Sequence, residues 1–263
     1  MRLRNMWVST LGLTLAASMV ACGSGSKETS APAESSAPSG QKVDAATAGD
    51  VNGVVSFEGV APKNEPIKMN ADPVCVKENT TPQTQETYEV ADGKLANVFV
   101  YVKDGLGAYS FDTPAEKVTI DQKNCRYHPH IFGIRVNQTL EILNSDPTLH
   151  NIHALPKGNT EFNTGQPIQG MKTEHKFTAK EVMVPFKCDV HGWMNAYVGV
   201  VDNPYFAVTD KDGKFSLKGL PPGTYTIEAW HEKLGPQSTM VTLGAKETKD
   251  ANFTFKAAAA ATD

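Results

Sequence analysis

The chain has 263 residues, of which 40% are hydrophobic and 8% aromatic, and its formal net charge at pH 7 is -4. Residues 1–21 contain two arginines and no acidic residue, so the net charge of the remainder moves from -4 to -6. A mildly acidic balance is usual for a globular surface. It argues against nucleic acid as a partner, because nucleic-acid binding needs lysine and arginine to neutralise phosphates.

The first 22 residues, MRLRNMWVSTLGLTLAASMVAC, predict export from the cytoplasm. A basic start precedes an apolar stretch at about residues 7–20, which is shorter than the roughly 20 residues that span a bilayer. It therefore reads as a secretory signal peptide over residues 1–21. Its end, Met-Val-Ala-Cys, resembles the bacterial lipoprotein signal, which implies a lipid on Cys22 and anchoring to a membrane of the bacterial cell envelope, in the periplasm or at the cell surface. An ordinary cleaved signal with a chance cysteine is the alternative.

Residues 22–50 are rich in Ser, Ala, Pro and Gly and contain no aromatic residue. Such a composition cannot bury a core and predicts a flexible linker. From residue 51 the composition becomes that of a globular protein, with about 200 residues for one large all-β domain or two small ones.

Four cysteines occur in the chain. Because the chain is expected to be exported to an oxidising compartment, we interpret them with disulfide formation in view. Cys22 is assigned to the lipid, and Cys188 lies in a loop with other metal-binding residue types. Cys75 and Cys125 remain, and we expect them to form a disulfide. The alternatives are that they join the metal site or stay buried and free.

Residues 117–256 read as short strands separated by turns, with no sustained helical period. Strand patterns include GIRV, LEIL, LHNIHAL, EVMVPFKC, NAYVGVV, KFSL, TYTIEAW and ANFTF. The turns SDPT, GNTEFNTG, DKDG and LPPG lie between them, which predicts an all-β protein of sandwich or Greek-key type. Asp212-Gly213 predicts a β-hairpin, because both residues tolerate positive φ.

The segment FKCDVHGWM (186–194) holds a cysteine, a histidine and a methionine three residues apart. Val184, Phe186 and Cys188 alternate along one strand face with Val182, so Cys188 is expected at the core end of that strand. His191 and Met194 follow on the turn before the next strand. A loop held by strands at both ends can direct three side chains at one point.

A second histidine is expected from HNIH (150–153). His150, Ile152 and Ala154 share the more apolar face of that strand, so His150 is predicted to point inward. His153 is predicted on the outer side, bonded to solvent or to a neighbour.

The resulting donor set is His150, Cys188, His191 and Met194. A thioether is a poor zinc ligand, and calcium and magnesium prefer oxygen. Two imidazoles, a thiolate and a weak axial thioether match blue copper, so one type 1 copper is the predicted cofactor.

The pattern F-x-C-x-x-H-x-x-M, with N-S-D-x-x-x-H-N-I-H upstream, resembles the cupredoxin family, plastocyanin and amicyanin in particular. The resemblance covers about residues 117–202 and implies a Greek-key β-sandwich, taken as residues 117–203. It implies the same four copper ligands, and that Asn151 bonds across to the cysteine loop. It also implies that the edge of His191 lies at the surface, ringed by apolar side chains. Gly192 departs from the family, which has proline after the histidine.

The segments on either side resemble a different family. TDKDGKFSLKGLPPGTYTIEAWHEKLG (209–235) is similar to the carboxypeptidase regulatory-like β-sandwich, a transthyretin-type module. GVVSFEGVAP (53–62) and LANVFVYV (95–102) resemble its earlier strands. We expect a sandwich split into residues 51–116 and 204–256, with the cupredoxin inserted and a tail at 257–263. Two consecutive domains are the alternative, and pairing of residues 51–57 with the 224–255 region distinguishes the two.

These features predict an electron-transfer lipoprotein rather than an enzyme. Its expected partners are a redox protein, such as a cytochrome or a membrane oxidoreductase, and the membrane through the lipid. A copper-binding or storage lipoprotein is the alternative. No function is assigned to His128, His130, His175 or the Trp230-His231-Glu232 stretch, which is interpreted as carrying an ordinary surface pair.

Overall fold

The computed structural model describes residues 40–257. The predicted signal peptide, the lipidation site Cys22 and most of the predicted linker lie outside these residues. The described part of the chain consists of β-strands and one short helix, which confirms the all-β fold class. Within it, no helix has the length and apolarity that crossing a membrane requires.

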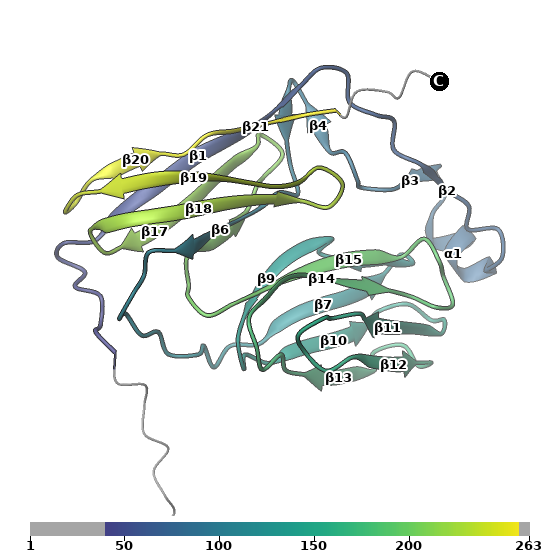
Figure 1. Ribbon diagram of the computed structural model, residues 1–263. Helices are drawn as coiled ribbons and strands as arrows, with labels where there is room; N and C mark the ends of the chain where they lie inside the picture. Colours follow the sequence, from purple (N-terminus) through teal and green to yellow (C-terminus); the bar gives the residue numbers. More distant parts are fainter. Residues whose placement is uncertain (1–39, 258–263) are drawn as a thin grey trace, which may run out of the picture. The chain divides into compact units, whose positions relative to one another are not determined.

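Residues 118–201 form a two-sheet sandwich, called here the central sandwich, in teal and green in Figure 1. One sheet has the order β13-β10-β7-β8, built from β7 (Val118–Lys123), β8 (Arg126–His128), β10 (Leu140–Asn144) and β13 (Lys172–His175). The other has the order β12-β11-β14-β15-β9, built from β9 (Ile131–Arg135), β11 (His150–Ala154), β12 (Phe162–Gln166), β14 (Glu181–Lys187) and β15 (Asn195–Val201). Its core takes buried side chains from both sheets, among them Ile120, Ile142, Ile152, Phe186 and Val198.

All the other strands except β2 and β3 form a second sandwich, called here the flanking sandwich. One sheet contains β1 (Gly49–Glu58), β4 (Val90–Ala91), β5 (Lys94–Leu95), β17 (Lys214–Leu220), β20 (Thr248–Asp250) and β21 (Phe253–Lys256). The other contains β6 (Phe99–Asp104), β16 (Phe206–Val208), β18 (Gly223–His231) and β19 (Gly235–Leu243). Its core likewise draws on both sheets, since Val55 and Leu217 of the first pack with Val100 and Ile227 of the second.

Strand β1, which comes first in the described chain, pairs with strands that come late in the sequence. It pairs antiparallel with β17, where Val51 faces Leu217, and parallel with β21, where Val55 faces Phe253. Strands that precede residue 118 and strands that follow residue 201 therefore share one sheet. The last residues of the predicted linker are part of the fold, because β1 starts at Gly49 and the Gln41 amide donates to the Ala108 carbonyl.

Two local expectations were wrong. The Asp212-Gly213 turn forms, with Gly213 at φ +69°, but it joins β16 and β17, which lie in different sheets, so it closes no hairpin. In β14 the register shifts between Glu181 and Val184, around Met183 at φ +65°. This β-bulge breaks the alternation at Val182, while Val184, Phe186 and Cys188 keep the shared buried face.

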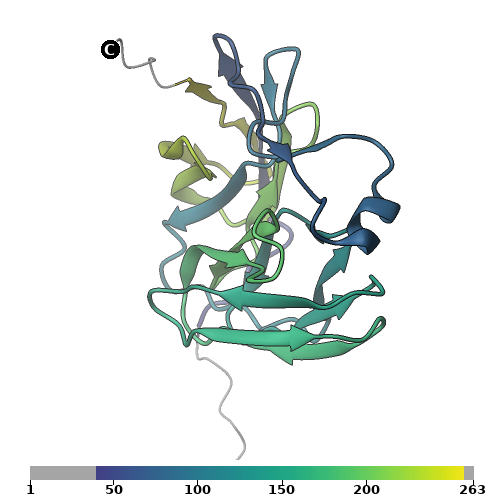
Figure 2. The same ribbon diagram turned by 90° about the vertical axis from the view of Figure 1, so that its right-hand side faces the viewer.

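A small element outside the sheets completes the fold at the site. Strands β2 (Pro66–Ile67) and β3 (Gln83–Thr84) pair, and helix α1 (Pro73–Glu78) lies between them in the chain, dark blue in Figure 2. The Asp72 carboxylate caps the helix by accepting from the Val74 and Cys75 amides, and proline follows at the first helical position. The sequence analysis did not predict this helix.

Candidate metal centre

The loop after β14 is closed by its own backbone. The Cys188 amide donates to the Met194 carbonyl at 3.2 Å, and the Met194 amide donates to the His191 carbonyl at 2.9 Å. Strands β14 and β15, which pair on both sides of the loop, anchor its ends. The cysteine and the histidine are thus held by local hydrogen bonds and by the sheet together.

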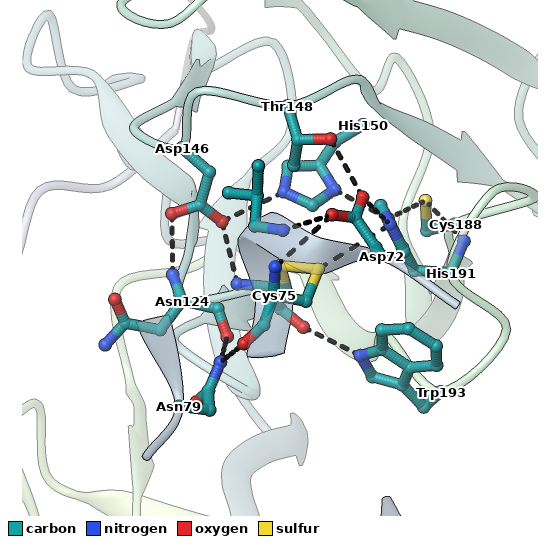
Figure 3. Close-up of a disulfide and its surroundings, with 12 residues drawn as sticks. Asp72, Cys75, Asn79, Asn124, Asp146, Thr148, His150, Cys188, His191 and Trp193 are labelled. Atoms are coloured by element: carbon teal, nitrogen blue, oxygen red, sulfur yellow. Dashed lines mark hydrogen bonds and ion pairs between the residues drawn. A yellow bond between two sulfur atoms is a disulfide. The ribbon is translucent and has the colours of Figure 1, made fainter. Parts of the chain in front are cut away.

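Three predicted ligands meet in the interior (Figure 3). Ligand atoms of His150, Cys188 and His191 lie within 4.8 Å of one another. His150 Nδ1 is 2.9 Å from His191 Nδ1, and the Cys188 sulfur is 3.8 Å from that same His191 nitrogen. All three side chains are buried. The fold brings a histidine of β11 against a loop 38 positions further along the chain.

Met194 is also buried, in the same apolar cluster as Cys188. Its main chain closes the loop, as described above. The fourth predicted ligand therefore lies in the same core as Cys188, and its partly buried neighbour Trp193 packs against the same cluster.

The expected exposure of His191 was wrong, since only 3% of its surface is accessible. Its Nε2 lies 3.0 Å from Asp72 Oδ2 and 3.7 Å from the Cys75 sulfur, and the ring of Trp193 is 5.0 Å away. Helix α1 and the residue that caps it cover the edge that the family resemblance placed at the surface. The FKCDVHGWM motif does not predict this cover, because Asp72 and helix α1 lie far from it in the sequence.

His150 also contacts a carboxylate, as His191 does. Its Nε2 donates to Asp146 Oδ2 at 2.9 Å, and Asp146 also accepts from the backbone amides of Asn124 and Cys125 at 2.8 and 2.7 Å. The sequence analysis missed both Asp72 and Asp146. The only available signal was the NSD run four residues before His150, which does not reveal a hydrogen bond.

A disulfide joins Cys75 to Cys125, as expected, with their Cα atoms 5.6 Å apart. It connects helix α1 to the turn between β7 and β8. The helix that Asp72 caps is therefore linked covalently to the turn whose amides bind Asp146 (Figure 3). Because both sulfurs are in the bridge, neither serves as a thiolate ligand.

Asn151 takes the position that the family resemblance implied. Its side-chain oxygen accepts from the Asp189 amide at 2.8 Å and lies 3.3 Å from the Cys188 sulfur. The His191 amide donates to the Cys188 sulfur at 3.3 Å. These contacts orient the sulfur toward the two imidazoles.

The surroundings shift the acidity of the groups at the site. Burial raises the pKa of the Cys188 thiol, but hydrogen bonds to His150 and His191 outweigh it and lower that pKa to about 6. Burial lowers the pKa of His150, but the contacts with Asp146 and Cys188 together outweigh burial and raise that pKa. Burial also opposes ionisation of Asp72 and Asp146, yet their hydrogen bonds to His191 and His150 lower both pKa values. The site therefore favours a thiolate flanked by ionised carboxylates.

The two imidazoles fit a metal ion for a simple reason. Each Nε2 faces a carboxylate and so carries its proton there, which leaves both Nδ1 lone pairs directed at each other across 2.9 Å. Two facing lone pairs repel, so either a proton or a cation must lie between them. Two nitrogens and a thiolate suit a soft or borderline ion such as copper better than calcium or magnesium.

The remaining histidines lie apart from this site. His153 is on the outer face, as expected, bonded to Asp189 and Glu161. His175 stacks on Phe162. The pair interpreted as a surface pair is not one, because His231 is buried and Glu232 forms a buried ion pair with His130 at 2.7 Å. His128 is exposed.

Comparison with known proteins matches one family model to part of the chain. Residues 194–256 match the carboxypeptidase regulatory-like domain, beginning ten residues before the predicted second part of the flanking sandwich. No curated protein matches the chain. Because the match covers a minor part of the chain, the remainder is described by its structure alone.

Several solved structures are similar to part of the chain. The copper-containing nitrite reductase NirK of Thermus scotoductus SA-01 is 22% identical, with a TM-score of 0.31, and the similarity covers 36% of this chain and 24% of that one. A purple cupredoxin of Nitrosopumilus maritimus is 24% identical (TM-score 0.28, 34% and 99% covered). A reduced Cu(I) form of an amicyanin variant is 19% identical (TM-score 0.29, 34% and 86% covered). These likenesses are slight, so the case for a metal rests on the geometry of the site.

Proposed function

We propose that this protein binds one copper ion at His150, Cys188, His191 and Met194 and carries single electrons between redox partners outside the cytoplasm. The observation that carries the proposal is the meeting of two imidazole Nδ1 atoms and a low-pKa thiol in a buried space. Bound copper would supply one-electron redox chemistry there.

The chain supplies rigidity and exclusion of water. His150, Cys188 and His191 are each at most 3% exposed, and each is held by a strand, a loop hydrogen bond or a carboxylate. Donors fixed in this way change position little between two oxidation states, which favours electron transfer. Asn151 limits the freedom of the sulfur in the same manner.

A redox partner cannot take the electron by touching His191, because that ring is covered. The electron must leave by another route. Trp193 is the candidate, since its ring lies 5.0 Å from His191 and is partly exposed. Its Nε1 donates to the Cys125 carbonyl at 2.9 Å, which holds the ring in place. A one-electron partner such as a cytochrome would dock at this end, where Val190, half exposed, adds apolar surface beside His191.

Visible and spin-resonance spectra of the fragment 40–257 after addition of Cu(II) test the metal site. We expect the intense visible band of a copper–thiolate bond and rapid electron exchange with a small cytochrome. Tight copper binding without that band rejects a type 1 site.

Copper storage is the second candidate function, and one observation favours it. The Asp72 carboxylate, helix α1 and the disulfide cover His191, so no ligand edge is open to a partner. A store would show the band and tight binding but exchange electrons slowly with the cytochrome. A carrier would show both the band and fast exchange.

Anchoring of the protein to a membrane of the bacterial cell envelope through a lipid on Cys22 is part of the proposal, and it is supported by the sequence of residues 1–22. Expression of the full chain with a radiolabelled fatty acid tests it. We expect label on the unsubstituted protein and none on C22S, with release of that variant from the membrane fraction.

A further inference from the structure

The strongest feature that the proposed function leaves unused is the pair of carboxylates behind the histidines. Asp72 Oδ2 is 3.0 Å from His191 Nε2, and Asp146 Oδ2 is 2.9 Å from His150 Nε2. Each carboxylate thus contacts the ring nitrogen opposite the one that faces the other histidine. Figure 3 shows the two pairs on either side of the Cys75–Cys125 disulfide.

Both carboxylates are held rigidly. Asp72 Oδ1 caps helix α1, while its Oδ2 also accepts from the Thr148 hydroxyl at 2.9 Å. Asp146 accepts two backbone amides from the turn that contains Cys125. The disulfide then fastens helix α1 to that turn, so the two carboxylates are positioned as one unit.

Neither charge is neutralised by a basic side chain. Among the ion pairs of residues 40–257, Asp72 pairs with His191 and Asp146 with His150, and neither pairs with lysine or arginine. The Asp146 side chain is 4% exposed and that of Asp72 17%, so solvent screens them weakly. Together with the Cys188 thiolate, three negative charges surround the two imidazoles.

We propose that Asp72 and Asp146 are positioning residues that bias this site toward a divalent over a monovalent ion, and so toward Cu(II) over Cu(I). Each carboxylate holds the Nε2 proton of its histidine, which leaves Nδ1 free as a ligand atom. A fixed negative charge also attracts an ion in proportion to the ion's charge. With neutral histidines, Cu(II) would leave a net charge of -1 at the site and Cu(I) a net charge of -2. Burial disfavours the larger charge.

The experiment measures the affinities of the metal-free protein for Cu(II) and Cu(I) by competition with chelators. The reduction potential of the copper-loaded protein gives the ratio of the two affinities independently. D72N and D146N each remove one charge, and asparagine remains a good helix cap at position 72. D72E retains the charge. D202N is the control for loss of a carboxylate charge elsewhere, because the exposed Asp202 side chain pairs with Lys180 and not with a histidine.

We expect the ratio of Cu(II) to Cu(I) affinity to fall roughly 10- to 100-fold in D72N and in D146N, with a higher reduction potential. D72E and D202N should keep the ratio within about twofold, well below the effect expected of a ligand-supporting residue. Because the two sites are substituted separately, one variant tests the inference if the other does not fold.

The inference depends on the proposed copper site but not on electron transfer. Equal loss of both affinities in the two variants, with the ratio unchanged, overturns it and leaves the copper site standing. Absence of copper binding by the unsubstituted protein overturns the proposed function as well. Slow exchange with a cytochrome overturns the carrier role alone.

Discussion

His150 and His191 face each other through their Nδ1 atoms across 2.9 Å, while the Nε2 atom of each ring is bonded to a carboxylate. The carboxylates determine where the ring protons lie, so both Nδ1 atoms are available as ligand atoms for one cation. The residues come from β11 and from the loop after β14, and no local segment could bring them together.

The first prediction concerns the thiolate. C188S replaces the sulfur by an oxygen that stays protonated at neutral pH, so the intense visible band should disappear. The control is V190S in the same loop, because the Val190 side chain is half exposed and lies outside the ligand set. A visible spectrum after Cu(II) addition measures the effect, and a band retained in C188S would exclude Cys188 as the ligand.

The second prediction concerns the thioether. M194L keeps a buried apolar side chain of similar volume, so the fold should be retained. Copper should remain bound, because an axial thioether tunes the site more than it holds the ion. The reduction potential should shift, and voltammetry measures it. An unchanged potential would show that Met194 is not a ligand.

The third prediction concerns stability. Copper binds the folded state, so at a free concentration 100 times the dissociation constant it should add about 2.7 kcal/mol to the free energy of unfolding. For a domain of this size, that corresponds to a rise in Tm of roughly 5–10 °C. Thermal melts of metal-free and copper-loaded fragment 40–257 measure it. Equal melting temperatures would contradict a preformed site.

The fourth prediction concerns the proposed electron route. W193A removes the ring that packs against His191, so electron exchange with a cytochrome should slow by at least roughly tenfold, a barrier increase of about 1.4 kcal/mol. The visible band should remain, because Trp193 is not a ligand. The matched control is W230F, since Trp230 packs against Tyr197, away from the ligands. Equal rates in W193A and the unsubstituted protein would place the route elsewhere.

The fifth prediction concerns pH and the flanking sandwich. Burial lowers the pKa of His231 to about 4, whereas an unfolded histidine titrates near ~6.5. Between these values the unfolded chain binds the extra proton, so stability should fall as the pH drops from about 6.5 through 4. The loss attributable to this group is roughly 3 kcal/mol.

Urea unfolding of the metal-free protein between pH 4 and 7 measures this dependence. H231Q cannot titrate, so it should show a shallower loss on acidification. H128Q is the control, because His128 is exposed. If H231Q and the unsubstituted protein lose the same stability over this range, the buried histidine is not the cause.

The features that depend on local residue order could be predicted from the sequence alone. Alternation along β11 and the second half of β14 placed His150 and Cys188 on buried faces, and three-residue spacing placed His191 and Met194 on one loop. The cysteine count identified the partners of the disulfide. These inferences succeed because side-chain direction in a strand follows from a two-residue period.

The enclosure of the site, by contrast, depends on packing between segments that are distant in the sequence. Asp72 lies 119 positions from His191, and its carboxylate reaches the ring only because the disulfide and helix α1 hold it there. The same packing buries His191, and it puts β16 and β17 in separate sheets although a tight turn joins them. Contacts between distant segments depend on how the faces of sheets and helices pack together. The local periodicity of a sequence carries no information about that packing.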